Sequence, residues 1–558
     1  MTIPRIREAG DSAILVEIGE GIDPDVNARA VVLAERLRAD PPAGVHDVIA
    51  TFRSVAVFFD PLRTDVDALK AHVLALRAEA GGRATARLVE VPVEYGGEAG
   101  PDLDAVAAAA GLSREDVVAR HASRDYRVFM IGFLPGFAYL GPVDASIAAA
   151  RRASPRVRVP AGSVGIAGQQ TAVYPQASPG GWQIIGRTTT RPFDPRRSPP
   201  SLLAPGDRVR FVPSPRGALG SFEAAWSSAD APVVDGGPRA VTVLHPGLMT
   251  TVQDAGRRGH LHEGVPLSGA MDRTALGDAN RAAGNAIDAA ALEVTLDGGE
   301  LRVEHAGALA VAGADLGVTL DGQPVPCGIR VPHEAGGVVR FGARRHGARA
   351  YLAFDGGVNV APVFGSRATD LTSGLGGVSG RRLRAGDRVP VGTWGPPSAF
   401  AKATADRSGG PDREVRGRAW PIPSGGARVR VLPGPHSDWF PRAALERLCR
   451  TRYEVTPESN RMGYRLRGAE PLPRETGEMI SDATCVGSLQ VPPSGQPILL
   501  LADRQVTGGY PIVATVITAD LPVVGQLAPG DWIEFDACTR ADALAALARL
   551  QATDDARA

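Results

Sequence analysis

Two short segments of the chain share one arrangement of polar side chains, Q-x-T-x-x-Y-P. They read QQTAVYP at residues 169–175 and QVTGGYP at residues 505–511. Glutamine offers a donor and an acceptor, threonine a hydroxyl, and tyrosine a hydroxyl on a rigid ring. Such groups on loops between strands of a rigid scaffold commonly form binding sites. The alternative is that glutamine and threonine only satisfy the backbone of their own loops.

A third segment, HASRDYRVFMIGFLPGFAYLGPVD at 121–144, concentrates aromatic side chains and glycines. Aromatic residues make up 5% of the chain, yet five fall within 14 residues here: Tyr126, Phe129, Phe133, Phe137 and Tyr139. Glycines let the backbone turn sharply and approach a ligand closely, and aromatic rings can form an apolar pocket wall. A buried aromatic corner between domains explains the same composition equally well.

Charged residues suggest further chemistry, but less specifically. Asp503 is the best acid/base candidate, although it could simply pair with Arg504 next to it. Arg257 and Arg258 could bind a carboxylate or phosphate, and surface solvation is the alternative. His260, His262 and Glu263 invite a metal interpretation, but an H-x-H without a third nearby ligand is weak. The four cysteines form no C-x-x-C pair, so neither a zinc ribbon nor a redox dithiol is indicated. We expect no metal site on this chain.

Composition excludes several classes of protein. The 558 residues carry no formal net charge, unlike a typical nucleic-acid binder. Lys70 and Lys402 are the only lysines, so there is no P-loop, no Met-Lys-Met biotin-acceptor sequence and no Ser-Ser-Lys amidase. No apolar run approaches the roughly 20 residues that span a bilayer. The first residues lack a secretory signal pattern, and we predict a cytoplasmic protein.

The elements that must position these residues fall into four predicted domains. Residues 1–82 read as a small α+β unit of the order β-α-β-β-α, and the chain beyond residue 85 as mainly β, in barrels or curved sheets. LLAPGDRVRF, RLRAGDRVPV and QLAPGDWIEF each place a Gly-Asp turn before a final strand. The remaining predicted ranges are 86–215, 241–392 and 427–540 for β-rich domains, with linkers at 216–240 and 393–426.

Both Q-x-T-x-x-Y-P segments lie between an apolar strand and a returning strand. VGIA precedes the first and WQIIGRT follows it, whereas PILLLA and IVATVI enclose the second. We therefore predict equivalent loops on two related barrels, facing a shared cleft between the two halves of the chain.

The longer motifs resemble two known families. GFLPGFAYLG and RVPAGSVGIAGQQTAVYPQASPGGWQIIGRT resemble allophanate hydrolase subunit 1, the family of the 5-oxoprolinase B subunit and of a sporulation-kinase inhibitor. Residues 243–294, AYLAFDGGVNVAPVFGSRATD and QVPPSGQPILLLADRQVTGGYP resemble allophanate hydrolase subunit 2, which is the 5-oxoprolinase C subunit. The first match covers about 1–215 and the second about 240–540, as in a fusion of the B and C subunits.

The resemblance implies cyclophilin-like β-barrels in both halves and ATP-dependent opening of 5-oxoproline to glutamate with a separate 5-oxoprolinase A subunit. It implies ATP and Mg²⁺, bound on the A subunit or at its interface, no covalent biotin on this chain, and a homodimer as one arrangement to test. For a small amide substrate we assign Asp503, Tyr510 and Gln505 as catalytic. The substrate-binding set is Phe133, Phe137, Tyr139, Gln169, Thr171, Tyr174, Arg504 and Thr507.

Two other functions remain open. The same modules form the carboxyltransferase part of urea amidolyase, which implies a biotin-dependent carboxyltransferase acting on urea or a related amide. The kinase-inhibitor relatives imply a regulator of a sensor histidine kinase, although fusing an inhibitor to its antagonist would be self-cancelling. Two residues depart from the family pattern: Asp355, where a more apolar residue is expected, and Cys485, where Gly or Pro-rich residues are more frequent.

Overall fold

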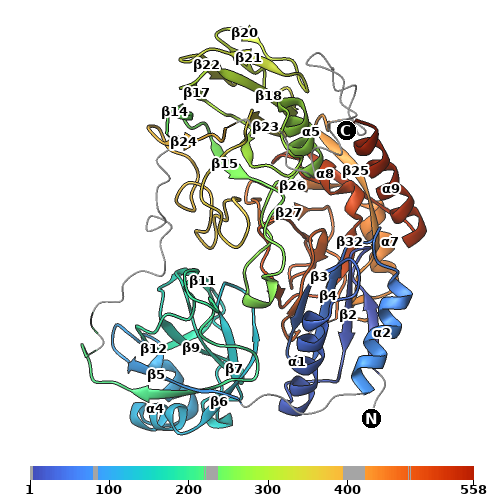
Figure 1. Cartoon of the computed structure of the whole chain (residues 1–558). Helices are drawn as coiled ribbons and strands as arrows, with labels where there is room; N and C mark the ends of the chain where they lie inside the picture. Colours follow the sequence, from blue (N-terminus) through green and yellow to red (C-terminus); the bar gives the residue numbers. More distant parts are fainter. Residues whose placement is uncertain are drawn as a thin grey trace.

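The computed structural model describes residues 4–78, 86–218, 220, 237–393, 422–475, 477 and 479–557. Most of the two predicted linkers, 216–240 and 393–426, lies outside these ranges. The described chain forms a small sheet, a closed barrel, a two-sheet unit and a second closed barrel, in that order (Figure 1). No helix in the described ranges has the length and apolar character needed to cross a membrane.

The first unit is a four-stranded antiparallel sheet with two helices on one face. Asp23 caps the first helix by accepting from the backbone N–H groups of Asp25 and Val26. The predicted β-α-β-β-α order is correct but lacks the first strand, whose sequence RIRE is polar. In sheet order the strands are β1 (Arg5–Glu8), β2 (Ala13–Glu17), β4 (Ser54–Phe59) and β3 (Val45–Ala50), and the helices are α1 (Pro24–Ala39) and α2 (Val66–Ala78).

The second unit is a closed seven-stranded barrel. Its two helices, α3 (Leu103–Ala110) and α4 (Arg114–Ala122), are separated at Gly111, which adopts the left-handed conformation (φ 64°) that glycine tolerates. In order around the barrel the strands are β13 (Arg208–Pro213), β6 (Asp125–Ile131), β7 (Ala138–Gly141), β10 (Gln170–Val173), β9 (Ser163–Ala167), β12 (Gln183–Arg187) and β5 (Leu88–Tyr95). A separate pair joins β8 (Arg156–Val159) and β11 (Ser178–Gly180).

The third unit packs two sheets around one apolar core. In the five-stranded sheet, alternate residues such as Val311 and Ala312 on one strand face this core and the helix α5 (Arg273–Ala283), respectively. That sheet contains β15 (Met249–Gln253), β16 (Ala291–Thr295), β23 (His346–Phe354), β18 (Gly307–Asp315) and β21 (Val331–His333). The six-stranded sheet contains β20 (Gln323–Pro324), β19 (Thr319–Leu320), β22 (Val338–Arg340), β17 (Glu300–Val303), β14 (Ala240–His245) and β24 (Arg388–Pro390).

The fourth unit is a second closed seven-stranded barrel, and its strand order repeats that of the first. The parallel pair of β5 and β13 in the first barrel corresponds to the parallel pair of β25 and β33 in the second. The strands are β33 (Trp532–Ala537), β26 (Tyr453–Val455), β27 (Gly463–Arg467), β30 (Ile498–Leu500), β29 (Ser488–Gln490), β32 (Ile512–Val516) and β25 (Gly426–Pro433). The helices are α7 (Ala443–Arg450), α8 (Leu521–Val524) and α9 (Arg540–Arg557).

The L-x-P-G-D motifs of LLAPGDRVRF and QLAPGDWIEF thus precede equivalent barrel strands, but the two Q-x-T-x-x-Y-P segments are not equivalent. The first lies mainly on β10, which corresponds to β30, whereas the second follows β30. The second segment includes β31 (Thr507–Gly508), which pairs with β28 (Asp482–Ala483) as β11 pairs with β8. Its counterpart in the first barrel is therefore SPGGW at 178–182. The predicted equivalence was wrong because strand position, not a short pattern, decides which loops correspond.

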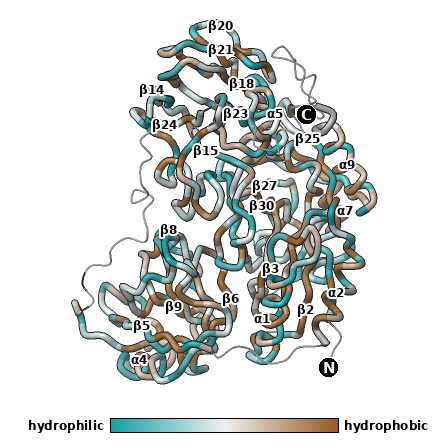
Figure 2. The backbone as a smooth tube through the Cα atoms, viewed as in Figure 1, coloured by the Kyte–Doolittle hydropathy of each residue, from teal (hydrophilic) through white to brown (hydrophobic). Residues whose placement is uncertain are grey.

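The amino-terminal sheet packs its other face against the second barrel (Figure 1). Ser54 Oγ donates to Asp482 Oδ1 at 2.7 Å, and Thr518 Oγ1 donates to Asp11 Oδ1 at 2.7 Å. Because both faces of the sheet are covered, β2 and β4 are apolar nearly throughout (Figure 2). The interface combines Ala13, Leu15, Ile49, Ala56 and Phe58 of the sheet with Leu261, Ala483, Cys485 and Val506.

Candidate functional site

The aromatic segment of the first barrel meets the second Q-x-T-x-x-Y-P segment directly. The backbone N–H of Phe133 donates to Thr507 Oγ1 at 3.1 Å. A Cβ on Gly132 would lie 2.2 Å from that same oxygen, so only glycine permits the approach. Burial raises the pKa of Tyr139, and the hydroxyl groups of Thr507 and Ser481 oppose this increase. Two barrels that are far apart in sequence therefore share one interface.

The aromatic residues assigned to the substrate pocket form a packed core instead of an open wall. The rings of Phe137 and Tyr139 are 4.9 Å apart, and those of Phe137 and Tyr174 are 5.3 Å apart. These three side chains are buried together with Trp182. Of the residues assigned to the apolar side, only Phe133 is partly accessible. This arrangement is the buried aromatic corner between domains that the sequence left as an alternative.

Two other predicted contact residues of the first barrel point away from this core. Thr171 Oγ1 lies 2.9 Å from His121 Nε2 inside the barrel, and burial lowers the pKa of His121 to about 3. Gln169 is exposed in the turn between β9 and β10. On β10, Thr171 and Val173 face the barrel interior, whereas Tyr174, just after the strand, faces the aromatic core, because successive side chains of an extended chain alternate in direction. The structure therefore does not bring Gln169, Thr171 and Tyr174 onto one wall.

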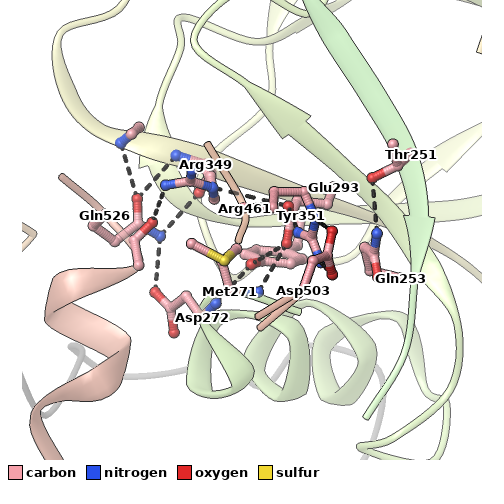
Figure 3. A network of polar contacts seen from close by, with 12 residues as sticks. Thr251, Gln253, Met271, Asp272, Glu293, Arg349, Tyr351, Arg461, Asp503 and Gln526 are labelled. Carbon is pink, nitrogen blue, oxygen red and sulfur yellow. Dashed lines mark hydrogen bonds and ion pairs between the residues drawn. The ribbon is translucent and has the colours of Figure 1, made fainter. Parts of the chain in front are cut away.

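Asp503 lies in a buried ion cluster that joins the third unit to the second barrel (Figure 3). Arg461 Nε donates to Asp503 Oδ2 at 2.9 Å and Arg461 Nη2 to Oδ1 at 3.1 Å, which makes the pair bidentate. Ser268 Oγ donates to Asp503 Oδ1 at 2.6 Å. The anticipated partner Arg504 instead donates to the carbonyl oxygen of Thr484 at 3.1 Å, so the suggested Asp503–Arg504 pair is wrong.

Glu293 on β16 is the second carboxylate of the cluster (Figure 3). Burial would raise its pKa, but the charges of Arg461 and Arg349 outweigh burial and keep the pKa below its usual value. Tyr351 Oη donates to Glu293 Oε2 at 2.7 Å, and the N–H of Met271 donates to the same oxygen at 3.0 Å. The cluster is therefore extensively hydrogen-bonded and holds Asp503 in a fixed position.

The other assigned residues of the second barrel lie in different environments. Thr507 is fully buried, and Gln505 is half-buried with its backbone carbonyl accepting from Thr484 Oγ1 at 2.6 Å. Tyr510 is 40% exposed, so its hydroxyl is accessible from solvent. Arg504 is buried, and its Nη1 atom has no hydrogen-bond partner.

Apart from Arg257, sequence reasoning assigned no role to a group of polar residues beside Asp503, on the segments 253–257 and 369–373. We call this group, Gln253, Arg257, Thr369, Asp370 and Ser373, the polar junction. Each member is buried and has one side-chain polar atom without a hydrogen-bond partner. Buried polar groups are nearly always satisfied, so this concentration requires an explanation, and a bound ligand would provide one. The family motifs include Gln253, Arg257, Thr369 and Asp370, but the sequence could not show that two segments so far apart in the chain meet.

Asp370 is the titratable centre of the polar junction. Its Oδ1 accepts from the backbone N–H of Thr372 at 3.0 Å, while Oδ2 has no partner. Burial and the nearby charge of Asp503 raise the pKa of Asp370 to about 6, and the nearby Ser373 and Arg257 oppose this shift. A carboxyl group with a pKa near neutrality can both accept and donate a proton at working pH.

Arg258 and Arg273 supply positive charge beside the polar junction. Both side chains are exposed, and within the described ranges no carboxylate lies at ion-pair distance from either. Protein atoms around the Arg273 side chain partly desolvate its guanidinium group, although the residue is exposed. This desolvation, together with the positive charge of Arg258, lowers the pKa of Arg273 to about 10. Two accessible guanidinium groups next to each other favour binding of an anion.

Three strained residues mark the contacts around the polar junction. Phe133, Ser268 and Phe364 have φ angles of 64°, 53° and 52°, and they are three of the six non-glycine residues with positive φ in the described ranges. This conformation costs on the order of 1–3 kcal/mol, and such strain is frequent at functional sites. Ser268 contacts Asp503, and the ring of Phe364 lies 6.1 Å from that of Phe193 in the first half.

The first half also contacts the polar junction and its neighbouring loop directly. Gln176, which follows the first Q-x-T-x-x-Y-P segment, donates from Nε2 to the carbonyl oxygen of Thr372 at 2.6 Å. The N–H of Gly136 donates to the carbonyl oxygen of Glu263 at 3.0 Å. The two Q-x-T-x-x-Y-P segments therefore approach one shared interface, although they occupy different positions in their barrels.

The residues that suggested a metal site in the sequence, His260, His262 and Glu263, do not form one. His260 Nδ1 lies 3.0 Å from Glu263 Oε2, and the His260 ring packs 4.7 Å from that of Phe364. No third metal ligand joins His260 and His262 within the described ranges. A surface cavity of about 400 Å³ lies against α7 and shares no residue with the polar junction; its lining is Arg442, Leu445, Glu446, Cys449, Arg450 and Ala537.

Comparisons with known proteins account for both halves. Residues 4–203 match the family model for carboxyltransferase domain subdomains C and D, and residues 263–537 match that for subdomains A and B. The 5-oxoprolinase B subunit of Bacillus subtilis (strain 168) is 42% identical over 220 residues, 37% of this chain and 92% of that protein. The 5-oxoprolinase C subunit of Escherichia coli (strain K12) is 41% identical over 307 residues, 54% of this chain and 93% of that protein. The chain is a fusion of members of the B-subunit and C-subunit families of 5-oxoprolinase.

The fused arrangement has a solved structural relative. The crystal structure of TTHA0988 superposes with a TM-score of 0.81 at 35% identity, and the match covers 94% of this chain and 99% of that one. Urea amidolyase of Saccharomyces cerevisiae is 31% identical over 315 residues, which are 53% of this chain but 16% of that protein. The polar junction thus lies where the half that is similar to the B subunit (4–218) meets the half that is similar to the C subunit (237–557).

Proposed function

We propose that the chain is the combined B and C component of a 5-oxoprolinase, which hydrolyses 5-oxoproline to glutamate with a separate A subunit and ATP. One observation carries the proposal: homologues of both the B and the C subunits, each matched over more than nine-tenths of its length, occur in one chain and meet at the polar junction. The relatives' names suggest the reaction, and the charges at the junction suit its substrate.

The substrate has two features that the junction can recognise. Its carboxylate would bind Arg258 and Arg273, the accessible guanidinium pair. Its lactam carbonyl would face Arg257, whose free Nη1 donor can stabilise the negative charge that develops on that oxygen when water adds. An unactivated lactam resists hydrolysis, and stabilising the charge on its oxygen is not enough to open it. The reaction would therefore also require ATP.

Asp370 is the acid/base in this proposal, in place of Asp503. As a carboxylate it would take a proton from the attacking water, and as a carboxylic acid it would return that proton to the lactam nitrogen when the C–N bond breaks. Asp503 acts as a positioning residue, because its charge raises the pKa of Asp370. The half-exposed Tyr510 and Gln505 could contact substrate only from the solvent side of the loop.

ATP and Mg²⁺ do not fit the polar junction as the described residues form it. Arginines could contact a phosphate, but the sequence has no P-loop, and no group of three metal ligands lies at the junction within the described ranges. We therefore propose that the A subunit or its interface with this chain binds the nucleotide, and we derive no step through it.

The test combines the purified chain with an A subunit, 5-oxoproline, ATP and Mg²⁺, and measures glutamate. Asp370→Asn should lower kcat by about 100-fold or more, as expected for loss of a general acid/base. Arg273→Ala should raise KM for 5-oxoproline by about 10-fold or more, as expected for a lost charge-assisted contact worth at least about 1.4 kcal/mol. The exposed Asp536 and Arg345 provide matched controls as Asp536→Asn and Arg345→Ala.

The urea amidolyase match favours one alternative, a biotin-dependent carboxyltransferase. It predicts turnover of carboxybiotin with urea or a related amide and no glutamate formation with the A subunit. That combination of results would overturn the 5-oxoprolinase proposal. Glutamate formation that survives Asp370→Asn unchanged would instead retain the activity and reject the assigned residue.

A further inference from the structure

Three metal-ligating side chains meet at one end of the five-stranded sheet in the third unit. His333 ends β21, His305 lies just before β18, and Asp355 follows β23, and these three strands are neighbours in the sheet. Gly307 pairs with His333, and the N–H of Asp355 donates to the carbonyl oxygen of Ala308 at 2.9 Å. The sheet register therefore fixes the three residues side by side, and none of them belongs to the polar junction.

The two histidine rings are buried without the hydrogen bonds that buried rings normally make. His305 and His333 are 7% and 6% exposed, and three of their four ring nitrogens have no partner: His305 Nε2 and both nitrogens of His333. Buried polar atoms without partners are rare and require an explanation. One ligand atom from each of His305, His333 and Asp355 lies within 4.8 Å of the others.

The fourth ring nitrogen indicates which tautomer His305 adopts. His305 Nδ1 lies 3.4 Å from the carbonyl oxygen of Ala240. Donation of the Nδ1 proton to that carbonyl leaves the lone pair on Nε2, which is the unpartnered atom. Metal-binding histidines usually direct their other N–H group to a carbonyl or carboxylate in this way.

The backbone groups of His305 and Glu334 lie near the His333 ring, yet neither makes a hydrogen bond with its nitrogens. The neighbours Pro332 and Glu334 are exposed, so an ion would have a short path from solvent.

Asp355 is ion-paired with two arginines, but only one of its oxygens is hydrogen-bonded by them. Its Oδ1 accepts from Arg239 Nη2 at 2.8 Å, whereas Oδ2 lies 3.6 Å from Arg330 Nη2, beyond hydrogen-bond distance. A Cβ on Gly307 would lie 2.7 Å from Asp355 Oδ1, so glycine makes room for this carboxylate. The two arginines partly neutralise the Asp355 carboxylate, so most of the affinity for a cation would come from the two imidazoles.

We propose that His305, His333 and Asp355 bind one Zn²⁺ ion, with water as the fourth ligand. Imidazole and carboxylate together suit zinc, whereas Mg²⁺ and Ca²⁺ prefer oxygen ligands alone. Ligand atoms of a tetrahedral zinc site lie about 3.4 Å apart when the bonds are about 2.1 Å long. Small rotations of the three side chains would close the present spacing. The ion would tie together the ends of β18, β21 and β23, independently of the proposed hydrolysis.

The test is metal binding by the full chain. After removal of metal with a chelator, the protein is dialysed against Zn²⁺, and bound zinc is measured by mass spectrometry; about one equivalent is expected. Co²⁺ as a probe should give d–d absorption without the thiolate charge-transfer band that cysteine ligands would produce. Zinc binding should also raise the melting temperature.

The variants His305→Gln and His333→Gln should each abolish this equivalent, while His346→Gln, at an exposed histidine, should retain it. Zinc below about 0.1 equivalent in the unmodified chain would overturn the proposal without any variant. Retention of the full equivalent in both site variants, or a thiolate band with Co²⁺, would overturn it as well. Near-ultraviolet circular dichroism establishes that the variants fold, and Asp355→Asn provides a third variant that should weaken binding by about 10-fold or more.

Discussion

Replacing Asp370 by asparagine tests the polar junction most directly, because the change should improve stability while it removes activity. Asparagine has nearly the shape of a protonated aspartate but cannot ionise. In the unmodified chain, burial and Asp503 raise the pKa of Asp370 from 3.8 to about 6. The folded protein is therefore destabilised whenever this carboxyl group must lose its proton.

The magnitude and sign follow from the two pKa values. Each pKa unit corresponds to about 1.36 kcal/mol, so the difference between 3.8 and about 6 is worth about 3 kcal/mol. The folded state holds the proton more tightly than the unfolded state. The contribution to stability is therefore fully present below about pH 4 and is lost as the pH rises through about 6. Asp370→Asn lacks this dependence.

The assay is urea unfolding of the full chain and of Asp370→Asn between about pH 4 and pH 7.5. The free energy of unfolding of the variant, relative to the unmodified chain, should increase by up to about 3 kcal/mol across this range. Asp536→Asn, at an exposed carboxylate, should show no comparable trend. A difference that stays constant with pH would refute the raised pKa and with it the acid/base role.

Three further substitutions test the contacts around the junction. Arg461→Met should lower the free energy of unfolding by about 3–5 kcal/mol, because it leaves two buried carboxylates without their shared partner; a loss below about 1 kcal/mol in urea would contradict this. Thr507→Val removes the acceptor for the Phe133 N–H and should cost about 1–3 kcal/mol, whereas Thr507→Ser should be tolerated; equal melting temperatures would argue against the contact. Gly132→Ala should separate the two barrels and abolish glutamate formation without changing far-ultraviolet circular dichroism, and full activity would show that the interface can adjust.

Much of the fold was predictable because local patterns determine it. The Gly111 break, the Asp23 cap and the alternating strands each depend on residues close in sequence. The L-x-P-G-D motifs correctly indicated two related units, because both precede the strand that pairs in parallel with the first strand of its barrel. The first strand, β1, was missed because its four residues, RIRE, include only one apolar residue.

The site was less predictable because its contacts join distant segments. Asp503 pairs with Arg461, 42 residues away, although Arg504 is its neighbour in sequence. Asp370 acquires its raised pKa from burial and from a carboxylate on another unit, and neither can be inferred from the residues around it. The aromatic segment lies at the interface of the two barrels, but its composition could not distinguish a pocket wall from a packed core.

The covered face of the amino-terminal sheet has a consequence for how the fusion works. Both units of the half that is similar to the B subunit contact the second barrel, one through Ser54 and Asp482 and the other through Phe133 and Thr507. The halves would therefore recognise each other as separate polypeptides, and cleavage between residues 221 and 236 should leave a complex that stays together. What the fusion adds is a fixed one-to-one stoichiometry and resistance to dilution, since a tether can hold its partners at an effective concentration on the order of millimolar.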